Sequence, residues 1–302
     1  MPAAHQTRRL RALAPAKVNL CLFLGPVRGD GRHELVTVFE SLSLADSLEL
    51  SVLDHGDDRV VCPGVPEPNL VSRALAGLRA AGWAGPPVAI EVFKRTPVAA
   101  GMGGGSADAA AALRLAAALA PVPPPVVTEI AASLGADVPA QLRPGPSLGT
   151  GAGEVVEPLE PLAPHALVIL PAPAGLATAE VYREADRLGL PRPAEELARL
   201  RRALAAALAH PGAALPDELV VNDLAAAAVS LRPAIARALA DARTTGADHA
   251  IVSGSGPTVA GLFWGEEATA RAAAAAGALS GRYPGACAVV PAAEPTGTVE
   301  AA

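Results

Sequence analysis

Apolar and polar residues alternate most clearly between residues 41 and 53. The even positions there are leucine or valine apart from Asp46, and the odd positions are mostly serine, with Glu49. This period of two is typical of a strand with one buried face, and because Asp46 interrupts it we predict two strands with a turn at 45–47. Mostly apolar runs predict the other strands, at 16–27, 88–95, 165–173, the two arms of 249–264, and 286–292.

Apolar residues spaced three and four apart predict the helices. The segment 69–82 has the clearest ends, with Asn69 as the N-terminal cap and Gly82 after the last turn. The remaining helices are predicted at 106–120, 124–134, 178–188, 193–209, 233–244 and 266–279. Strands come first and helices mix with strands later, which favours an α+β fold. Because prolines punctuate residues 154–164, we predict two domains, 1–162 and 163–302.

Composition narrows the class of protein. The chain has 302 residues, 51% of them apolar, which allows two domains with sizeable cores. A net charge of −6 argues against nucleic-acid binding, which needs a basic face. We see no apolar run that could span a membrane and no signal peptide, so the arginines near the N-terminus are expected to lie in a solvated leader before the first strand. The three cysteines lie far apart, which favours reduced thiols in a cytoplasmic protein. The six histidines are scattered, so we expect no zinc site. Nothing in the sequence identifies a protein partner.

Lysine is rare in this chain. Among its 24 basic residues, only Lys17 and Lys94 are lysines, and the rest are arginines. An ammonium is a compact point charge and a guanidinium is a larger planar group, so these two positions are candidates for a specific role. Chance alone could also leave two.

The segment 96–110, TPVAAGMGGGSADAA, joins a predicted strand to a predicted helix. It is not a P-loop, because Gly105 is followed by Ser106 and not by lysine. It is not a dinucleotide fingerprint either, because the sixth position, counted with Gly101 as the first, is again Ser106 and not glycine. The helix start still offers backbone N–H groups to an anion, and glycines let a polyphosphate lie against the backbone. A plain turn would need only one or two glycines, so we favour phosphate binding; Ser106 would cap the helix or offer its hydroxyl to phosphate or metal.

Three further stretches of sequence support the hypothesis of phosphate binding. PAKVNLCL carries Lys17 and Asn19, GADVPA carries Asp137, and SGSGPTV is a second glycine-rich loop at 253–259. Together with the first loop they resemble the motifs of the GHMP kinase superfamily, here at 15–22, 97–107 and 252–259. The resemblance implies an N-terminal domain like domain 2 of ribosomal protein S5 and a ferredoxin-like C-terminal domain. Without it, Lys17 would be read as a surface cation and Asp137 as a turn or helix cap.

Within the superfamily, DGRHEL at 30–35 and GADVP are similar to the kinases of the non-mevalonate isoprenoid pathway, whose small-molecule substrate carries a cytidine diphosphate group. The resemblance implies that Lys17 and Asp137 are catalytic, with Asp137 accepting or orienting the proton of the attacking hydroxyl and Lys17 offsetting charge. Mg²⁺ would accompany ATP, with ligands that we leave unassigned. The residues implied to hold ATP are Pro97, Val98, Ala99, Ala100, Gly101, Met102, Gly103, Gly104, Gly105, Ser106 and Ala107.

The same resemblance implies a substrate site. His33 would hydrogen-bond the cytosine and Tyr182 would stack on it. The residues assigned to the substrate are Asn19, His33, Thr178, Tyr182, Gly254, Ser255 and Gly256. The chain departs from the family pattern at Arg32, where an aromatic residue is usual, at Ala140, where phenylalanine is usual, and at Ala107, where a second serine is common.

Three alternatives remain open at this point. The chain could be another GHMP small-molecule kinase, like homoserine or mevalonate kinase, or an inactive nucleotide-binding homologue. The retained pair Lys17 and Asp137 argues against the second of these. A dinucleotide oxidoreductase is disfavoured by the missing glycine of the fingerprint.

Overall fold

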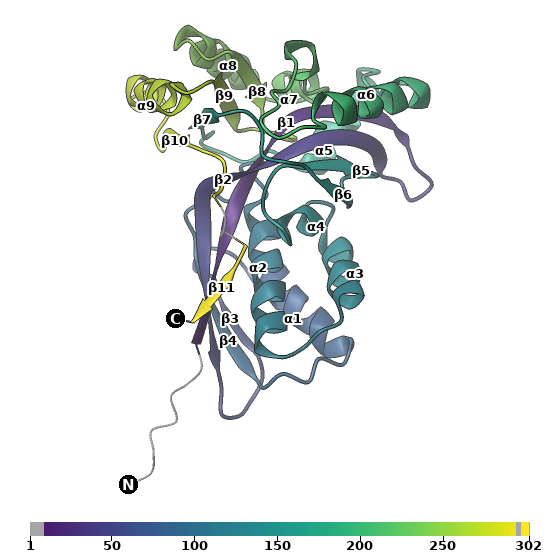
Figure 1. The fold of residues 1–302 in the computed structure, drawn as a ribbon, viewed down its shortest axis with the longest axis vertical. Coiled ribbons are helices and arrows are strands. Elements are labelled where there is room, and N and C mark those ends of the chain that lie inside the picture. The colour runs from purple at the N-terminus through teal and green to yellow at the C-terminus, as the bar shows by residue number, and fades with distance from the viewer. Residues whose placement is uncertain (1–8, 294–296, 302) are drawn as a thin grey trace.

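The computed structural model describes residues 9–293 and 297–301, and its strands form two sheets. The first sheet is built on two long antiparallel strands, β1 (Arg9–Val27) and β2 (His33–Val52), which in Figure 1 run from one end of the sheet to beneath the second. Its other strands are β3 (Arg59–Val61), β4 (Val88–Phe93), β5 (Ser147–Thr150), β6 (Val155–Pro158) and β11 (Val299–Ala301). The order is β11-β1-β2-β4-β3, and β5 pairs with β2 and β6.

Strand β2 continues through residues 45–47, so the predicted turn is wrong. The side chain of Asp46 is fully buried, and its carboxylate accepts hydrogen bonds from the backbone N–H of Arg95 and Thr96 and from Lys94 Nζ. A carboxylate that receives this many donors can remain inside a strand. The irregularity lies in the pairing with β1, whose register shifts between Pro15 and Lys17.

Strand β1 is longer than predicted and begins at Arg9 instead of residue 16. Arg9 and Arg11, expected in a leader, are therefore strand residues with exposed side chains. The other residues of that leader, 1–8, lie outside the described part of the chain.

Helices α1 (Leu70–Ala80), α2 (Gly104–Leu119) and α3 (Pro124–Leu134) lie on one face of the first sheet, and the short α4 (Val138–Gln141) follows them (Figure 1). The predicted cap of α1 is confirmed, because the Asn69 side chain accepts hydrogen bonds from the N–H groups of Val71 and Ser72. The buried face of α2 is mostly alanine, which lets this helix approach β1 closely.

The second sheet contains β7 (His165–Leu170), β8 (His249–Val252), β9 (Val259–Trp264) and β10 (Cys287–Val289). Its order is β10-β7-β9-β8, with every pair antiparallel, so the strands lie in the order 4-1-3-2 of a ferredoxin-like fold. The predicted α+β fold is confirmed. The helices of this part are α5 (Thr178–Arg187), α6 (Ala194–Ala207), α7 (Ala225–Leu231), α8 (Ala234–Thr244) and α9 (Ala268–Leu279), with a 3₁₀ turn, η1 (Asp217–Leu219). Among the described residues, no helix is long and apolar enough to cross a membrane.

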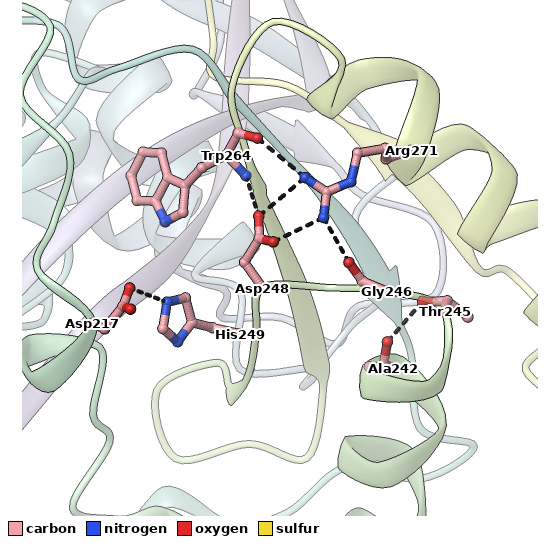
Figure 2. Close-up of polar contacts among 8 residues, drawn as sticks. All are labelled: Asp217, Ala242, Thr245, Gly246, Asp248, His249, Trp264 and Arg271. Carbon is pink, nitrogen blue, oxygen red and sulfur yellow. Dashed lines mark hydrogen bonds and ion pairs between the residues drawn. The ribbon is translucent and has the colours of Figure 1, made fainter.

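An ion-pair network braces the β8–β9 hairpin at the end away from its turn (Figure 2). Arg271 of α9 forms an ion pair with Asp248 at 2.8 Å and donates to the carbonyls of Trp264 and Gly246. Asp248 in turn accepts from the N–H of Trp264 at 2.7 Å. The network ties α9 to both arms of the hairpin, whose other end is the glycine-rich turn at 253–258.

Besides the chain connection after β6, a second chain segment and a buried apolar cluster join the two sheets. After β10 the chain returns to the first sheet, where Pro291 bridges to Leu42 and β11 pairs with β1. A cluster of buried apolar side chains also lies between the sheets, with Val18 and Val38 from the first and Leu167 from the second. The domain limit between residues 162 and 163 stays a prediction.

Candidate active site

A cavity of about 720 Å³ opens where the first sheet, the loop before α2 and the turn of the second sheet meet. The predicted site residues that line it are Lys17, Asn19, Pro97, Val98, Ala99, Ala100, Gly101, Met102, Gly103, Gly104, Gly105, Ser106, Asp137, Thr178, Tyr182, Gly254 and Ser255. Three predicted residues are not part of its lining: His33, Ala107 and Gly256. Segments far apart in the sequence are therefore brought to one place.

Lys17 lies in β1 and is only 4% exposed, and its ammonium group has two polar partners in the described chain. Lys17 Nζ donates to Asn19 Oδ1 at 2.7 Å and lies 3.3 Å from Asp137 Oδ2. Asn19 Nδ2 donates to the Thr37 hydroxyl, which donates to a backbone carbonyl of β1. The ammonium also lies 5.3 Å from the centre of the Phe39 ring. These contacts fix the position of the Lys17 ammonium. Asn19, which we assigned to the substrate, bonds to Lys17 through its side-chain oxygen.

Asp137 occupies the N-cap position of α4, but its side chain makes no capping hydrogen bond. Its carboxylate is 37% exposed, and Lys17 is the partner that the structure gives it within the described chain. An ionised carboxylate can accept several hydrogen bonds, so Asp137 keeps acceptor capacity for a ligand. Asp137 therefore lies in a turn at the start of α4, as the alternative reading expected, but its side chain does not cap the helix.

The first glycine-rich loop ends in a left-handed Gly103, with φ 65°, which is the N-cap of α2. The first backbone bond of the helix runs from Ala107 N to Gly103 O, so the N–H groups of Gly104, Gly105 and Ser106 take no part in helical hydrogen bonds. The N-cap of α2 is therefore Gly103 and not Ser106. The prediction that Ser106 caps the helix is wrong, and its hydroxyl stays a candidate for phosphate or metal. A set of N–H groups at a helix start that takes no part in helical hydrogen bonds favours an anion.

The loop is packed against Lys17 and against the second glycine-rich turn. Lys17 N donates to Met102 O at 2.9 Å. Gly101 has a φ of +76°, and a Cβ there would lie 2.5 Å from Gly256 O. Ser253 Oγ donates to Gly101 O at 3.1 Å. Both loops thus need glycine for close backbone approach, and Gly256 shapes the contact without lining the cavity.

Two polar residues hold the second turn. Asn222 Nδ2 donates to the carbonyls of Val252 and Gly254, at 2.8 and 2.7 Å. The hydroxyls of Thr178 and Ser255 are 3.1 Å apart, which joins the start of α5 to the same turn. No local pattern marks Asn222, because the turn that it holds lies 32 positions away.

His33 and Tyr182 lie together, with ring centres 5.3 Å apart. His33 Nε2 lies 2.7 Å from Asp186 Oδ1, a partner that the sequence did not suggest. Burial raises the pKa of Tyr182, with a smaller contribution from the Asp137 charge, so its hydroxyl stays protonated. Arg32 does not replace the family's aromatic residue at the cavity, because it pairs with Asp30 and is half exposed.

The cavity extends past the first loop to residues that the sequence did not single out as a site. Lys94 Nζ reaches Asp46 Oδ2 at 2.5 Å and Asp108 Oδ2 at 2.7 Å. The scarcity of lysine was the one signal pointing to this place. The other residues lining this part are Cys62, Val65, Pro66, Pro68, Asn69, Leu70, Val71 and Arg73.

No group of three or more His, Cys, Asp or Glu side chains in the described ranges could hold a metal ion. Mg²⁺ bound with a nucleotide usually keeps waters and takes only one or two carboxylates besides the phosphates. Asp137 and Ser106 offer oxygen atoms in the cavity that fit this limited share.

Comparisons with known proteins agree with this geometry. The family model "GHMP kinases N terminal domain" matches residues 69–145, and "GHMP kinases C terminal" matches residues 194–282. A 4-diphosphocytidyl-2-C-methyl-D-erythritol kinase from Anaeromyxobacter dehalogenans (strain 2CP-C) is 40% identical over 292 residues, which cover 93% of this chain and 88% of that protein. The protein of the same name from Streptomyces coelicolor is 42% identical over 261 residues, covering 82% and 85%.

Solved structures give the same result. A crystal structure of 4-(cytidine 5'-diphospho)-2C-methyl-D-erythritol kinase superposes with a TM-score of 0.73 at 34% identity, covering 94% of this chain and 100% of that one. Homoserine kinase from Cytophaga hutchinsonii reaches a TM-score of 0.69 at 18% identity, with 99% and 100% covered, which shows the shared fold alone.

The fold, the two glycine-rich loops and the two matched regions define a GHMP kinase. Within that class, the chain belongs to the family of the 4-diphosphocytidyl-2-C-methyl-D-erythritol kinases, which it matches at about 40% identity over most of its length.

Proposed function

We propose that this chain transfers the γ-phosphoryl group of ATP to a hydroxyl of 4-diphosphocytidyl-2-C-methyl-D-erythritol, giving the 2-phosphate, in the non-mevalonate isoprenoid pathway. Family membership supports the reaction. The observation that carries the residue assignment is the 3.3 Å contact between Lys17 Nζ and Asp137 Oδ2, at the point where two glycine-rich loops meet.

Phosphoryl transfer depends on positioning and charge stabilisation more than on covalent work by the protein. Asp137 would accept the proton of the substrate hydroxyl, or orient that hydroxyl. The oxygen of the substrate hydroxyl then attacks the γ-phosphorus of ATP, and ADP leaves. Lys17 would neutralise part of the charge that develops on the transferred group. Its bond to Asn19 keeps the ammonium in place during this step.

The phosphates of ATP would lie against the free N–H groups at the start of α2. The nucleoside would then extend toward the part of the cavity between Asn69 and Lys94, whose lining is mainly apolar. Mg²⁺ would supply further charge neutralisation, and the Ser106 hydroxyl is an oxygen donor that the chain offers it at the start of α2. The substrate would approach from the side of Thr178, Tyr182 and Ser255, with its cytosine near His33.

A coupled assay of ADP release tests this assignment. We expect turnover with 4-diphosphocytidyl-2-C-methyl-D-erythritol and none with homoserine or mevalonate at equal concentration. Turnover of homoserine with no reaction of the cytidine substrate would overturn the proposal and favour the alternative kinase. ATP binding without turnover of any of the three alcohols would favour an inactive homologue. A cytoplasmic location stays a prediction.

A further inference from the structure

His33 and Asp186 form a contact that joins the two halves of the molecule. His33 begins β2 of the first sheet, and Asp186 lies in α5 of the second part. His33 Nε2 and Asp186 Oδ1 are 2.7 Å apart, and the His33 side chain is only 6% exposed. Asp186 lies one helical turn after Tyr182, so both residues face His33 from the same side of α5.

In the neutral form of His33, this contact decides which hydrogen-bonding role each ring nitrogen takes. An ionised carboxylate only accepts hydrogen bonds, so Nε2 must carry the hydrogen and donate it to Asp186. In a neutral imidazole the other nitrogen, Nδ1, is then an acceptor. Nδ1 has no hydrogen-bond partner in the described part of the chain, and it is not among the buried unpaired atoms, so it remains open to solvent or ligand.

We infer that Asp186 is a positioning residue that fixes His33 with Nδ1 as an acceptor, and that this selects cytosine over uracil. Cytosine carries an amino group at position 4, which can donate to Nδ1. Uracil carries a carbonyl there, which would place one acceptor against another. A site built to bond a donor rejects a ligand that lacks it, because the site's polar atom is then left unpaired.

This inference rests on the proposed function, in which His33 contacts the base, and a binding experiment separates the two. Cytidine 5′-diphosphate and uridine 5′-diphosphate are titrated into the full chain while a non-hydrolysable ATP analogue saturates the nucleotide site. We expect the wild-type chain to bind the cytidine compound at least about 100-fold more tightly. Equal binding of the two would overturn the inference. Selective binding by a chain that turns over no cytidine substrate would sustain the inference and overturn only the proposed function.

The Asp186→Ala variant tests the role of the carboxylate. Its affinity for the cytidine compound should fall roughly 10-fold, and its preference over the uridine compound should shrink to within about 10-fold. Asp186→Asn should retain most of the preference, because its amide oxygen can still accept from Nε2. Glu184→Ala is the matched control: this carboxylate lies on the same helix but pairs with Arg187 and Ser230, and its loss should leave the preference unchanged.

A double-mutant cycle shows whether Asp186 acts through His33. In a His33→Ala background, Asp186→Ala should have no further effect on base preference. Nitrogen NMR of the ring should show the Nε2-protonated form in the wild type and a mixture in Asp186→Ala. If Asp186 were only a strut between the two halves, its loss would weaken ATP, cytidine and uridine binding alike and leave the preference intact, which would overturn the inference.

Discussion

The two lysines of this chain lie in one cavity but in opposite surroundings. Lys17 faces a single carboxylate, Asp137, which is 37% exposed and 3.3 Å away. Lys94 lies between two buried carboxylates, Asp46 and Asp108, at 2.5 and 2.7 Å. The first centre keeps acceptor capacity free, whereas in the second the ammonium and most carboxylate oxygens are already bonded to the protein.

The Lys17–Asp137 pair therefore has a carboxylate that is free to act on a ligand, whereas the cluster of Lys94, Asp46 and Asp108 stabilises the fold. Asp46 alone receives three donors, from the end of β4 and the segment after it, which join β2 to the start of the glycine-rich loop. The side chain of Asp137 makes no capping hydrogen bond, so its carboxylate can bind a ligand. We therefore expect substitution at the Lys94 centre to lower stability and substitution at the Lys17 centre to lower turnover.

The largest effect is expected for Lys94→Met, which removes the cation from two buried carboxylates. Breaking a buried ion pair on one side costs about 3–5 kcal/mol of unfolding free energy. Urea unfolding followed by circular dichroism measures it. Lys17→Met is the matched variant, and its loss should be clearly smaller because Asp137 can be solvated. Equal losses would mean that the two centres do not differ as described.

Asp137→Asn should come next and should act on rate. Losing the proton acceptor should lower kcat by roughly 10²-fold or more, while the affinity for ATP and the unfolding midpoint change little. Steady-state ADP release and nucleotide titration give the two numbers. Asp217→Asn, the same change at an exposed residue that pairs with His249 (Figure 2), should leave kcat unchanged. An unaltered rate in Asp137→Asn would remove this residue from the mechanism.

The smallest effect is expected for Asp108→Asn and appears as a pH dependence. Burial raises the pKa of Asp108 to about 7, against the attraction of Lys94, since one ammonium cannot balance two buried carboxylates. The folded pKa exceeds the unfolded value of 3.8, so Asp108 stabilises the wild type most below that value and loses this contribution as pH rises to about 7. Asp108→Asn lacks this term, so its unfolding free energy relative to wild type should rise steadily between pH 4 and about 7 and level off above that.

Urea unfolding at several pH values, with Glu218→Gln at an exposed position as the control, measures the difference. A constant gap between Asp108→Asn and wild type across that range would show that Asp108 is ionised throughout.

Sequence reasoning found the parts of the site that lie in continuous motifs. The two glycine-rich loops, Lys17 and Asp137 were predicted together, and the structure brings them to one cavity. It missed Asp186 and Asn222, because each acts on a residue far away in the chain and has an ordinary local context. Their positions depend on how the two sheets meet, which no local pattern encodes.

The errors in the fold have the same origin. A buried aspartate in a strand was read as a turn, since the donors that satisfy Asp46 lie about fifty residues away. The short strands β3, β5, β6 and β11 were not predicted, because strands of three or four residues depend on their partner more than on their own pattern. Long helices, by contrast, were predicted to within a few residues.

Strand β11 has a consequence for the order in which the molecule can assemble on the ribosome. It pairs with β1 from Leu10 opposite Ala301 to Ala12 opposite Val299, so the outer edge of β1 is completed by the far end of the chain. A nascent chain therefore carries an open strand edge, a surface prone to aggregation, until residues 299–301 have been synthesised.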